Sequence, residues 1–247
     1  MDRRNFLKTG GIALLGSLAT GSAMALTTPG ALGGEGADKK AAVALAMNHF
    51  GVSEADLKKV LAAALEKGGD YADLFFEHTI SNSIRLMDGA VNNSYSNIDY
   101  GVGVRVLTGD QSGYAYVENI TVEDMLKAAR TAARIASANK GNKPLNLTEK
   151  ELKKNYYTVA SPWEEVSLKD KMPYLQKLND RIFALDKRVH KVQASQSDTT
   201  SHIFFCNSEG VMFYDYRPMV TLGAVCIMEE DGKTENGYAA RAYRRGF

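Results

Sequence analysis

The sequence predicts an α+β protein built from two modules, each an antiparallel or mixed β-sheet packed with helices. Apolar residues recur at helical spacing in a few capped segments and alternate along most of the rest. The order of helices followed by strands occurs twice along the chain, which is typical of an α+β layout. The chain has 247 residues, of which 45% are hydrophobic, so it can bury a sizeable core or two smaller ones.

An export signal is predicted over residues 1–25. A twin-arginine motif is followed by a modestly apolar, glycine-rich stretch and then by a small-x-small cleavage site. The motif residues are Arg3, Arg4, Phe6 and Leu7, and the cleavage residues are Ala23 and Ala25. The alternatives are a core helix or a membrane anchor, and an anchor needs about 20 mostly apolar residues. We therefore expect twin-arginine export to the periplasm, with no membrane anchor after cleavage.

The first module is expected at residues 53–138, behind a leader and a short helix at residues 26–52. Ser53, with Asp56 three residues later, is the predicted N-cap of a helix that ends at Gly68-Gly69. Alternation then predicts an antiparallel meander, and a helix capped by Thr121 covers one of its faces. The predicted strands are Ala72–Thr79, Ser83–Met87, Val91–Tyr95, Tyr100–Leu107 and Ser112–Val117.

The second module is expected at residues 163–247, after a polar, lysine-rich linker at residues 139–162. It begins with a helix capped by Ser167 and continues from Val189 almost entirely as strand. We expect it to be β-rich and incomplete at its C-terminal end.

Charge and motifs exclude several functions. The net charge is +1 for the whole chain and close to −1 without residues 1–25, and no basic stripe is present, so nucleic-acid binding is not expected. The sequence has no H-E-x-x-H helix, no G-x-S-x-G elbow and no phosphate-binding glycine loop. Gly101-Val102-Gly103 lacks a third glycine and alternates like a strand, where glycines mark a bulge or a close backbone approach.

The histidines and acidic residues support no site by their spacing. His49, His78, His190 and His202 lie on separate predicted elements, and we interpret each as a surface or a buried, hydrogen-bonded histidine. Acid–base pairs could be imagined among the carboxylates, but solvated strand and turn carboxylates are commoner. These carboxylates are Glu77, Asp88 and Glu118. No catalytic residue and no metal ligand is assigned.

Two cysteines in an exported protein raise the question of a disulfide. Cys206 is expected in a strand over His202–Asn207 and Cys226 in one over Val220–Glu229, with a strand over Val211–Arg217 between them. In a simple meander the cysteines would be two strand spacings apart, about 9.6 Å, which exceeds the roughly 7 Å limit for a bridge. We therefore predict buried free thiols, although a different strand order would change this.

Several segments in order resemble the TldD/PmbA metalloprotease family, from Ser53 to Phe247. The resemblance lies in the segments Gly69–Glu77, Asp88-Gly89, Gly101–Val106 and Gly113–Tyr116 and in the terminal Arg-Arg-Gly-aromatic segment Tyr243–Phe247. The terminal segment is similar to one that TldD-type members carry shortly before their catalytic region. The motif residues to which we assign a structural role are Asp73, Gly101, Gly103 and Arg105.

The resemblance implies a peptidase that acts on extended or unfolded peptides inside a closed chamber, formed as a homo- or heterodimer with a TldD/PmbA-type subunit. In that family zinc is held by a His-Glu-x-x-x-His helix and a distant cysteine, at positions expected downstream of Phe247. We therefore expect an inactive N-terminal fragment that forms part of the chamber wall. Edge strands within Val189–Tyr243 could hold a peptide by strand addition. The alternative is a stand-alone periplasmic binding or scaffolding module, or an inactive partner subunit.

Overall fold

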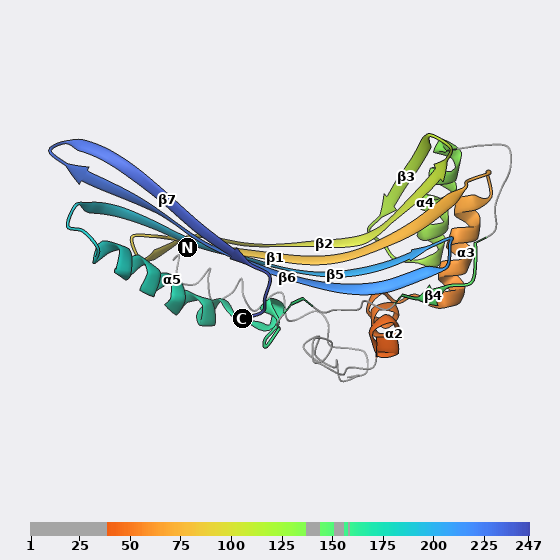
Figure 1. Cartoon of the computed structure of the whole chain (residues 1–247), viewed down its shortest axis with the longest axis horizontal. Coiled ribbons are helices and arrows are strands. Elements are labelled where there is room, and N and C mark those ends of the chain that lie inside the picture. The colour runs from red at the N-terminus through yellow and green to blue at the C-terminus, as the bar shows by residue number, and fades with distance from the viewer. Residues whose placement is uncertain (1–38, 137–143, 151–155, 158) are drawn as a thin grey trace, which may run out of the picture.

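One long, curved β-sheet organises the molecule. The computed structural model describes residues 39–136, 144–150, 156–157 and 159–247, so the predicted export signal and its cleavage site lie outside it. The sheet has seven strands in the order β3-β2-β1-β5-β6-β4, with β7 paired to β6. In Figure 1, α3 and α4 lie at one end of the sheet and α5 at the other.

Four of the strands are much longer than the sequence analysis expected. The strands are β1 Tyr71–Met87, β2 Ala90–Thr108, β3 Gln111–Val117, β4 Thr148–Glu149, β5 Val189–Asn207, β6 Val211–Glu230 and β7 Lys233–Tyr243. The expected strands Ala72–Thr79 and Ser83–Met87 are parts of β1, because the polar residues between them are paired on both sides. Ser81, for example, is opposite Asn97 of β2 and Thr199 of β5.

The α+β class is confirmed, and the two expected modules share one sheet. β1 pairs with β5 in antiparallel register from Asp73 opposite Asn207 to Met87 opposite Gln193. The expected linker contributes the short strand β4, which pairs in parallel with the start of β6, whereas the other strand pairs of the described residues are antiparallel.

The helices begin where the capping residues predict. They are α2 Lys39–Phe50, α3 Glu54–Leu65, α4 Val122–Ile135 and α5 Leu168–Phe183, with a short 3₁₀ helix η2 Trp163–Glu165. Ser53 and Asp56 form a capping box at α3, and the side chains of Thr121 and Ser167 accept hydrogen bonds from backbone amides of α4 and α5. No helix within the described ranges is long and apolar enough to cross a bilayer.

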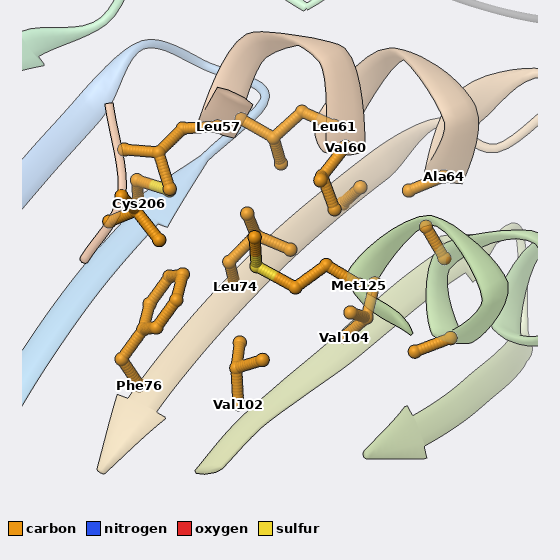
Figure 2. Close-up of a cluster of buried hydrophobic side chains, with 14 of the residues drawn as sticks. Leu57, Val60, Leu61, Ala64, Leu74, Phe76, Val102, Val104, Met125 and Cys206 are labelled. Carbon is orange, nitrogen blue, oxygen red and sulfur yellow. The ribbon is translucent and has the colours of Figure 1, made fainter. Parts of the chain in front are cut away.

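Two hydrophobic clusters lie on the same face of the sheet, one near each end. The larger cluster packs α2, α3 and α4 against β1, β2 and β5. Figure 2 shows Leu57 and Leu61 of α3 above Leu74 of β1, and Met125 of α4 beside Leu74 and next to Val104 of β2. The smaller cluster packs Leu175 of α5 against Ile84, Leu86 and Ala194. Leu74, Ile84 and Leu86 share a face because alternate residues of a strand point the same way.

A polar band separates the two clusters on this covered face. Lys171 of α5 forms a buried ion pair with Asp198 of β5, 2.8 Å between Nζ and Oδ2, and Asn82 of β1 donates a hydrogen bond to the same carboxylate. The Lys171 ammonium also lies 5.5 Å from the centre of the Trp163 ring. Because an unpaired buried charge is costly, these contacts fix how α5 sits on the sheet.

The opposite face of the sheet carries no helix in the described ranges and is lined by hydroxyl groups across β1 and β5. The hydroxyls of Thr79 and Ser201 are hydrogen-bonded at 2.8 Å, and the neighbouring rows pair Ser81 with Thr199 and Ser83 with Ser197. This open face is therefore hydrophilic along its middle.

Both cysteines are free, as predicted, but the geometric reason was wrong. Val211–Glu230 is one strand, so Cys206 and Cys226 lie on neighbouring strands rather than two spacings apart. Cys226 is opposite Val192, 14 residues along β5 from Cys206, or about 46 Å at roughly 3.3 Å per residue. Cys206 is buried, which raises the pKa of its thiol, whereas Cys226 is half-buried rather than buried as expected.

Candidate functional site

The first half of β2 forms an open sheet edge. Residues 90–101 pair with β1 on one side, whereas β3 pairs only with residues 102–108 on the other. Every side chain from Ala90 to Tyr100 is exposed, including the large apolar side chains of Val91, Tyr95 and Ile98. The segment contains no Lys, Arg, Glu or Pro, which are among the residues that proteins commonly use to block an exposed edge. This edge is suited to pairing with another extended chain.

A hollow of about 480 Å³ lies where β3 stops pairing with β2 and the open edge begins. Its walls include carboxylates and tyrosines, namely Glu77, Asp99, Tyr114, Tyr116 and Glu118. Glu77 is opposite Gly101 and Asp99 is opposite Thr79, which places both carboxylates on the open face of the sheet. Thr79 donates a hydrogen bond to Glu77, and Asn97 donates one to Asp99.

Two glycines shape this region by allowing close approach. A Cβ at Gly103 would lie 2.5 Å from the hydroxyl of Tyr114, and one at Gly101 would lie 2.5 Å from the carbonyl oxygen of Val117. Real Cβ atoms essentially never come so close, so a side chain at either position would displace Tyr114 or the backbone of β3. The glycines therefore let β3 and its tyrosines lie over β2.

The other two motif residues form an ion pair beside the hollow. Asp73 of β1 is opposite Arg105 of β2, and Nε and Nη2 of the guanidinium donate to one carboxylate oxygen of Asp73 at 2.9 and 2.5 Å. The hydrogen bonds from Arg105 to Asp73 and the attraction between them raise the pKa of the guanidinium. The pair joins β1 and β2 on the open face. The Asp73 carboxylate already balances the positive charge of Arg105.

On the covered face three histidines meet next to Tyr100. Cross-strand pairing places Tyr100, His78, His202 and Tyr216 in one row across β2, β1, β5 and β6. His49, at the end of α2, lies against this row: its Nε2 is 2.8 Å from Nδ1 of His78, and its ring centre is 4.8 Å from that of His202. We call His49, His78 and His202 the histidine cluster.

Burial and repulsion between imidazoles favour the neutral forms of His49 and His78. Burial and repulsion from the neighbouring histidines lower the pKa of His49 to about 4, and burial and repulsion from His202 lower the pKa of His78. His202 contacts the Tyr214 hydroxyl at 2.7 Å and Glu164 at 3.2 Å. Burial alone would raise the pKa of Glu164, but its contact with His202 outweighs that effect, so the pKa is lowered.

The cluster does not have the geometry of a metal site. The ring planes of His49 and His78 are 29° apart and their facing nitrogens share a hydrogen bond, so these lone pairs do not converge on a common point. Within the described ranges no three side chains of His, Cys, Asp or Glu are grouped so that they could hold a metal ion.

Comparison with known proteins assigns the chain to a family. The sequence profile of PmbA/TldA metallopeptidase domain 1 matches residues 72–136, and that of the PmbA/TldA metallopeptidase central domain matches residues 161–247. The chain belongs to the TldD/PmbA metallopeptidase family. Both matched ranges contribute strands to the single sheet, β1 to β3 from the first and β5 to β7 from the second.

Relatives within the TldD/PmbA family support this assignment. The metalloprotease TldD homolog of Haemophilus influenzae is 31% identical over 182 residues, which are 72% of this chain and 37% of the relative. Two solved structures share the fold at lower identity. A proposed modulator of DNA gyrase from Bacteroides thetaiotaomicron has a TM-score of 0.62 at 13% identity over 77% of this chain and 45% of its own. TldE from Thermococcus kodakarensis has a TM-score of 0.55 at 16% identity over 76% and 43%.

The chain thus spans less than half the length of each of these proteins. Metalloprotease relatives imply zinc in the family. The histidine cluster does not fit that ion, because its nitrogens bond to one another, to Tyr214 and to Glu164.

Residues that the sequence did not group lie together in two places, the hollow on the open face and the histidine cluster on the covered face. Glu77 and Glu118 both line the hollow, whereas Asp88 lies at the β1–β2 turn and accepts a hydrogen bond from Val192. His190 lies outside the cluster, near Glu229. His78 and His202 are 124 residues apart in the sequence, and their contact depends on the register between β1 and β5. No local sequence signal could therefore have grouped them.

Proposed function

We propose that this chain is the peptide-holding wall of an exported TldD-type zinc metallopeptidase, whose closed chamber a second TldD/PmbA-type subunit completes. The family assignment supports a role in peptide hydrolysis. The open edge of β2 is the observation that supports the more specific role of holding an extended peptide. Extended peptides bind such edges through main-chain hydrogen bonds, largely independently of their sequence. This suits a protease that acts on extended or unfolded peptides.

β2 is a better candidate for this role than β7, the edge strand of the second module. β7 carries Lys233, Glu235 and Arg241, and charged residues are one means by which proteins protect exposed edges from pairing. The open half of β2 carries one charge, Asp99, together with Tyr95 and Ile98. The strand-addition hypothesis therefore moves from the Val189–Tyr243 region to residues 90–101.

Binding of backbone-modified peptides tests this role. We would measure, by fluorescence anisotropy, the binding of a labelled, unstructured peptide as long as the open edge, with alternating apolar residues. In an extended peptide, alternate backbone amides point to opposite edges of the peptide. A second peptide of the same sequence would be N-methylated at the amides of one peptide edge, and a third peptide at the amides of the other. Strand addition uses one edge of the peptide, so one modified peptide should bind about 100-fold more weakly, from three lost hydrogen bonds of roughly 1 kcal/mol each.

The other modified peptide is the internal control and should retain most of the affinity. Equal affinity of all three peptides would contradict strand addition. Mass spectrometry of the same samples should show intact peptide, because no zinc site is formed by the described residues. Cleavage that a chelator abolishes would contradict the proposal that this chain holds peptides without hydrolysing them.

Export by the twin-arginine pathway is part of the same proposal and rests on residues 1–25. Replacing Arg3 and Arg4 by lysine keeps the charge but removes the arginine pair. In a bacterium with an active twin-arginine system, we expect the wild-type chain in the periplasmic fraction and the double variant in the cytoplasmic fraction. Equal periplasmic amounts of both would contradict this route, and Arg244→Lys with Arg245→Lys provides a matched control pair.

A further inference from the structure

The hollow beside the β2 edge has a negative charge with no cation to balance it. Glu77, Asp99 and Glu118 line it, and in the described part of the chain none of the three is in an ion pair. Thr79 and Asn97, which donate to Glu77 and Asp99, are neutral. Arg105 is nearby in the strand but is bound to Asp73.

The register places the negative groups close together. Glu77 is opposite Gly101, and Asp99 is two residues from Gly101 on the same face of β2. Such diagonal neighbours across an antiparallel pair lie roughly 7–8 Å apart, so their like charges repel. Glu118 follows directly on the last residue of β3, Val117, which is opposite Val102. A cation between these carboxylates would relieve the repulsion.

Tyrosines supply the rest of the wall. Tyr114 and Tyr116, whose side chains lie on the open face, are 58% and 66% exposed. Exposed tyrosine rings attract ammonium and guanidinium groups through their faces and also cover the apolar stems of Lys and Arg. A site with both aromatic walls and carboxylates fits a long side chain with a cationic tip better than it fits a bare metal ion, which binds mainly oxygen ligands.

The position of the hollow links it to a peptide on the β2 edge. β3 pairs with β2 up to Val117, and the edge that β3 leaves open begins at Gly101. A peptide that continues the line of β3 along β2 therefore passes the hollow, and every second side chain of that peptide points to the open face. One of these side chains would lie next to Glu77 and Glu118.

We infer that this hollow receives a lysine or arginine side chain of a peptide paired with the open edge of β2. The inference rests on the proposed function, because it assigns a side-chain preference to the same binding edge. It gives the peptide-holding surface a preference for basic residues at one position.

Peptides that differ in a single charge test the inference. We would compare a labelled peptide that contains one lysine with the same peptide containing norleucine, which keeps the stem but has no ammonium group. We expect the lysine peptide to bind about 10-fold more tightly at low salt and less so at high salt. In the variant Glu77→Gln with Glu118→Gln, the two peptides should bind almost equally.

The control is Glu235→Gln, which removes an exposed carboxylate on β7 and should leave the lysine preference unchanged. Thermal unfolding of each variant shows whether it is folded. Equal affinity of the wild-type chain for both peptides would overturn the inference while leaving strand addition intact, whereas no binding of either peptide would overturn the proposed function itself. Concentration-dependent dimerisation that the Glu77→Gln, Glu118→Gln variant abolishes would assign the hollow to a second copy of the chain and also overturn the inference.

Discussion

At the residue scale, two members of the histidine cluster, His49 and His78, lie in surroundings that oppose their protonation. His49 approaches His78 and His202 from α2, and the charged or titratable groups facing them are Glu164 of η2, Tyr100 of β2 and Tyr214 and Tyr216 of β6. Burial and the mutual repulsion of the imidazoles lower the pKa of His49 to about 4 and lower that of His78. The cluster therefore links the packing of α2 to pH.

We predict that the protein loses stability as the pH falls from 7 to 5. A histidine whose folded pKa lies below its unfolded value of about 6.5 binds more protons when unfolded, so its contribution is lost as the pH falls from 6.5 toward 4. Because the His49 side chain is only partly buried and keeps contact with solvent, we expect on the order of 1 kcal/mol, or about 2–4 °C in Tm. His49→Gln should reduce the difference in Tm between pH 7 and pH 5 by about that amount.

His190→Gln is the matched control for this experiment. His190 lies on β5 outside the cluster, with its side chain 54% exposed. Its replacement should leave the difference in Tm between pH 7 and pH 5 unchanged. The account would be wrong if His190→Gln reduced that difference as much as His49→Gln does, or if the wild-type protein were equally stable at both pH values.

At the element scale, the helix starts could be predicted and the strand lengths could not. Ser53, Thr121 and Ser167 cap their helices through contacts within three residues, which the sequence displays directly. The extent of β1 depends instead on partners far along the chain, since Asn82 is satisfied by Asp198. Polar residues inside β1 therefore resembled a break between two strands.

The same distinction explains what could be predicted of the candidate site. Gly101, Gly103, Asp73 and Arg105 stood out as motif residues because they occur in a recognisable order. The hollow required the lateral position of β3 on β2, and the histidine cluster required the register between β1 and β5 as well as the position of α2. Each of these is a property of tertiary pairing, so Glu77, Glu118 and the histidines could be named but not grouped.

At the scale of the whole molecule, all the described helices pack on one face of a single sheet and leave the other face and the β2 edge free of helices (Figure 1). Apolar clusters near the two ends hold the long strands in place, and the hydroxyl-lined middle of the open face faces outward. This arrangement suits a wall that presents an extended binding edge on a rigid sheet. The central claim is that residues 90–101 are that edge.

Amide hydrogen exchange with and without peptide tests this claim most directly, because strand addition adds hydrogen bonds to specific backbone amides. With peptide at about ten times its Kd, the amides of Ala90–Gly101 that do not bond to β1 should exchange about 10-fold more slowly. The amides of β7, from Lys233 to Tyr243, serve as the control edge and should not change. Slower exchange in β7 alone, or no change in Ala90–Gly101 at saturating peptide, would contradict the account.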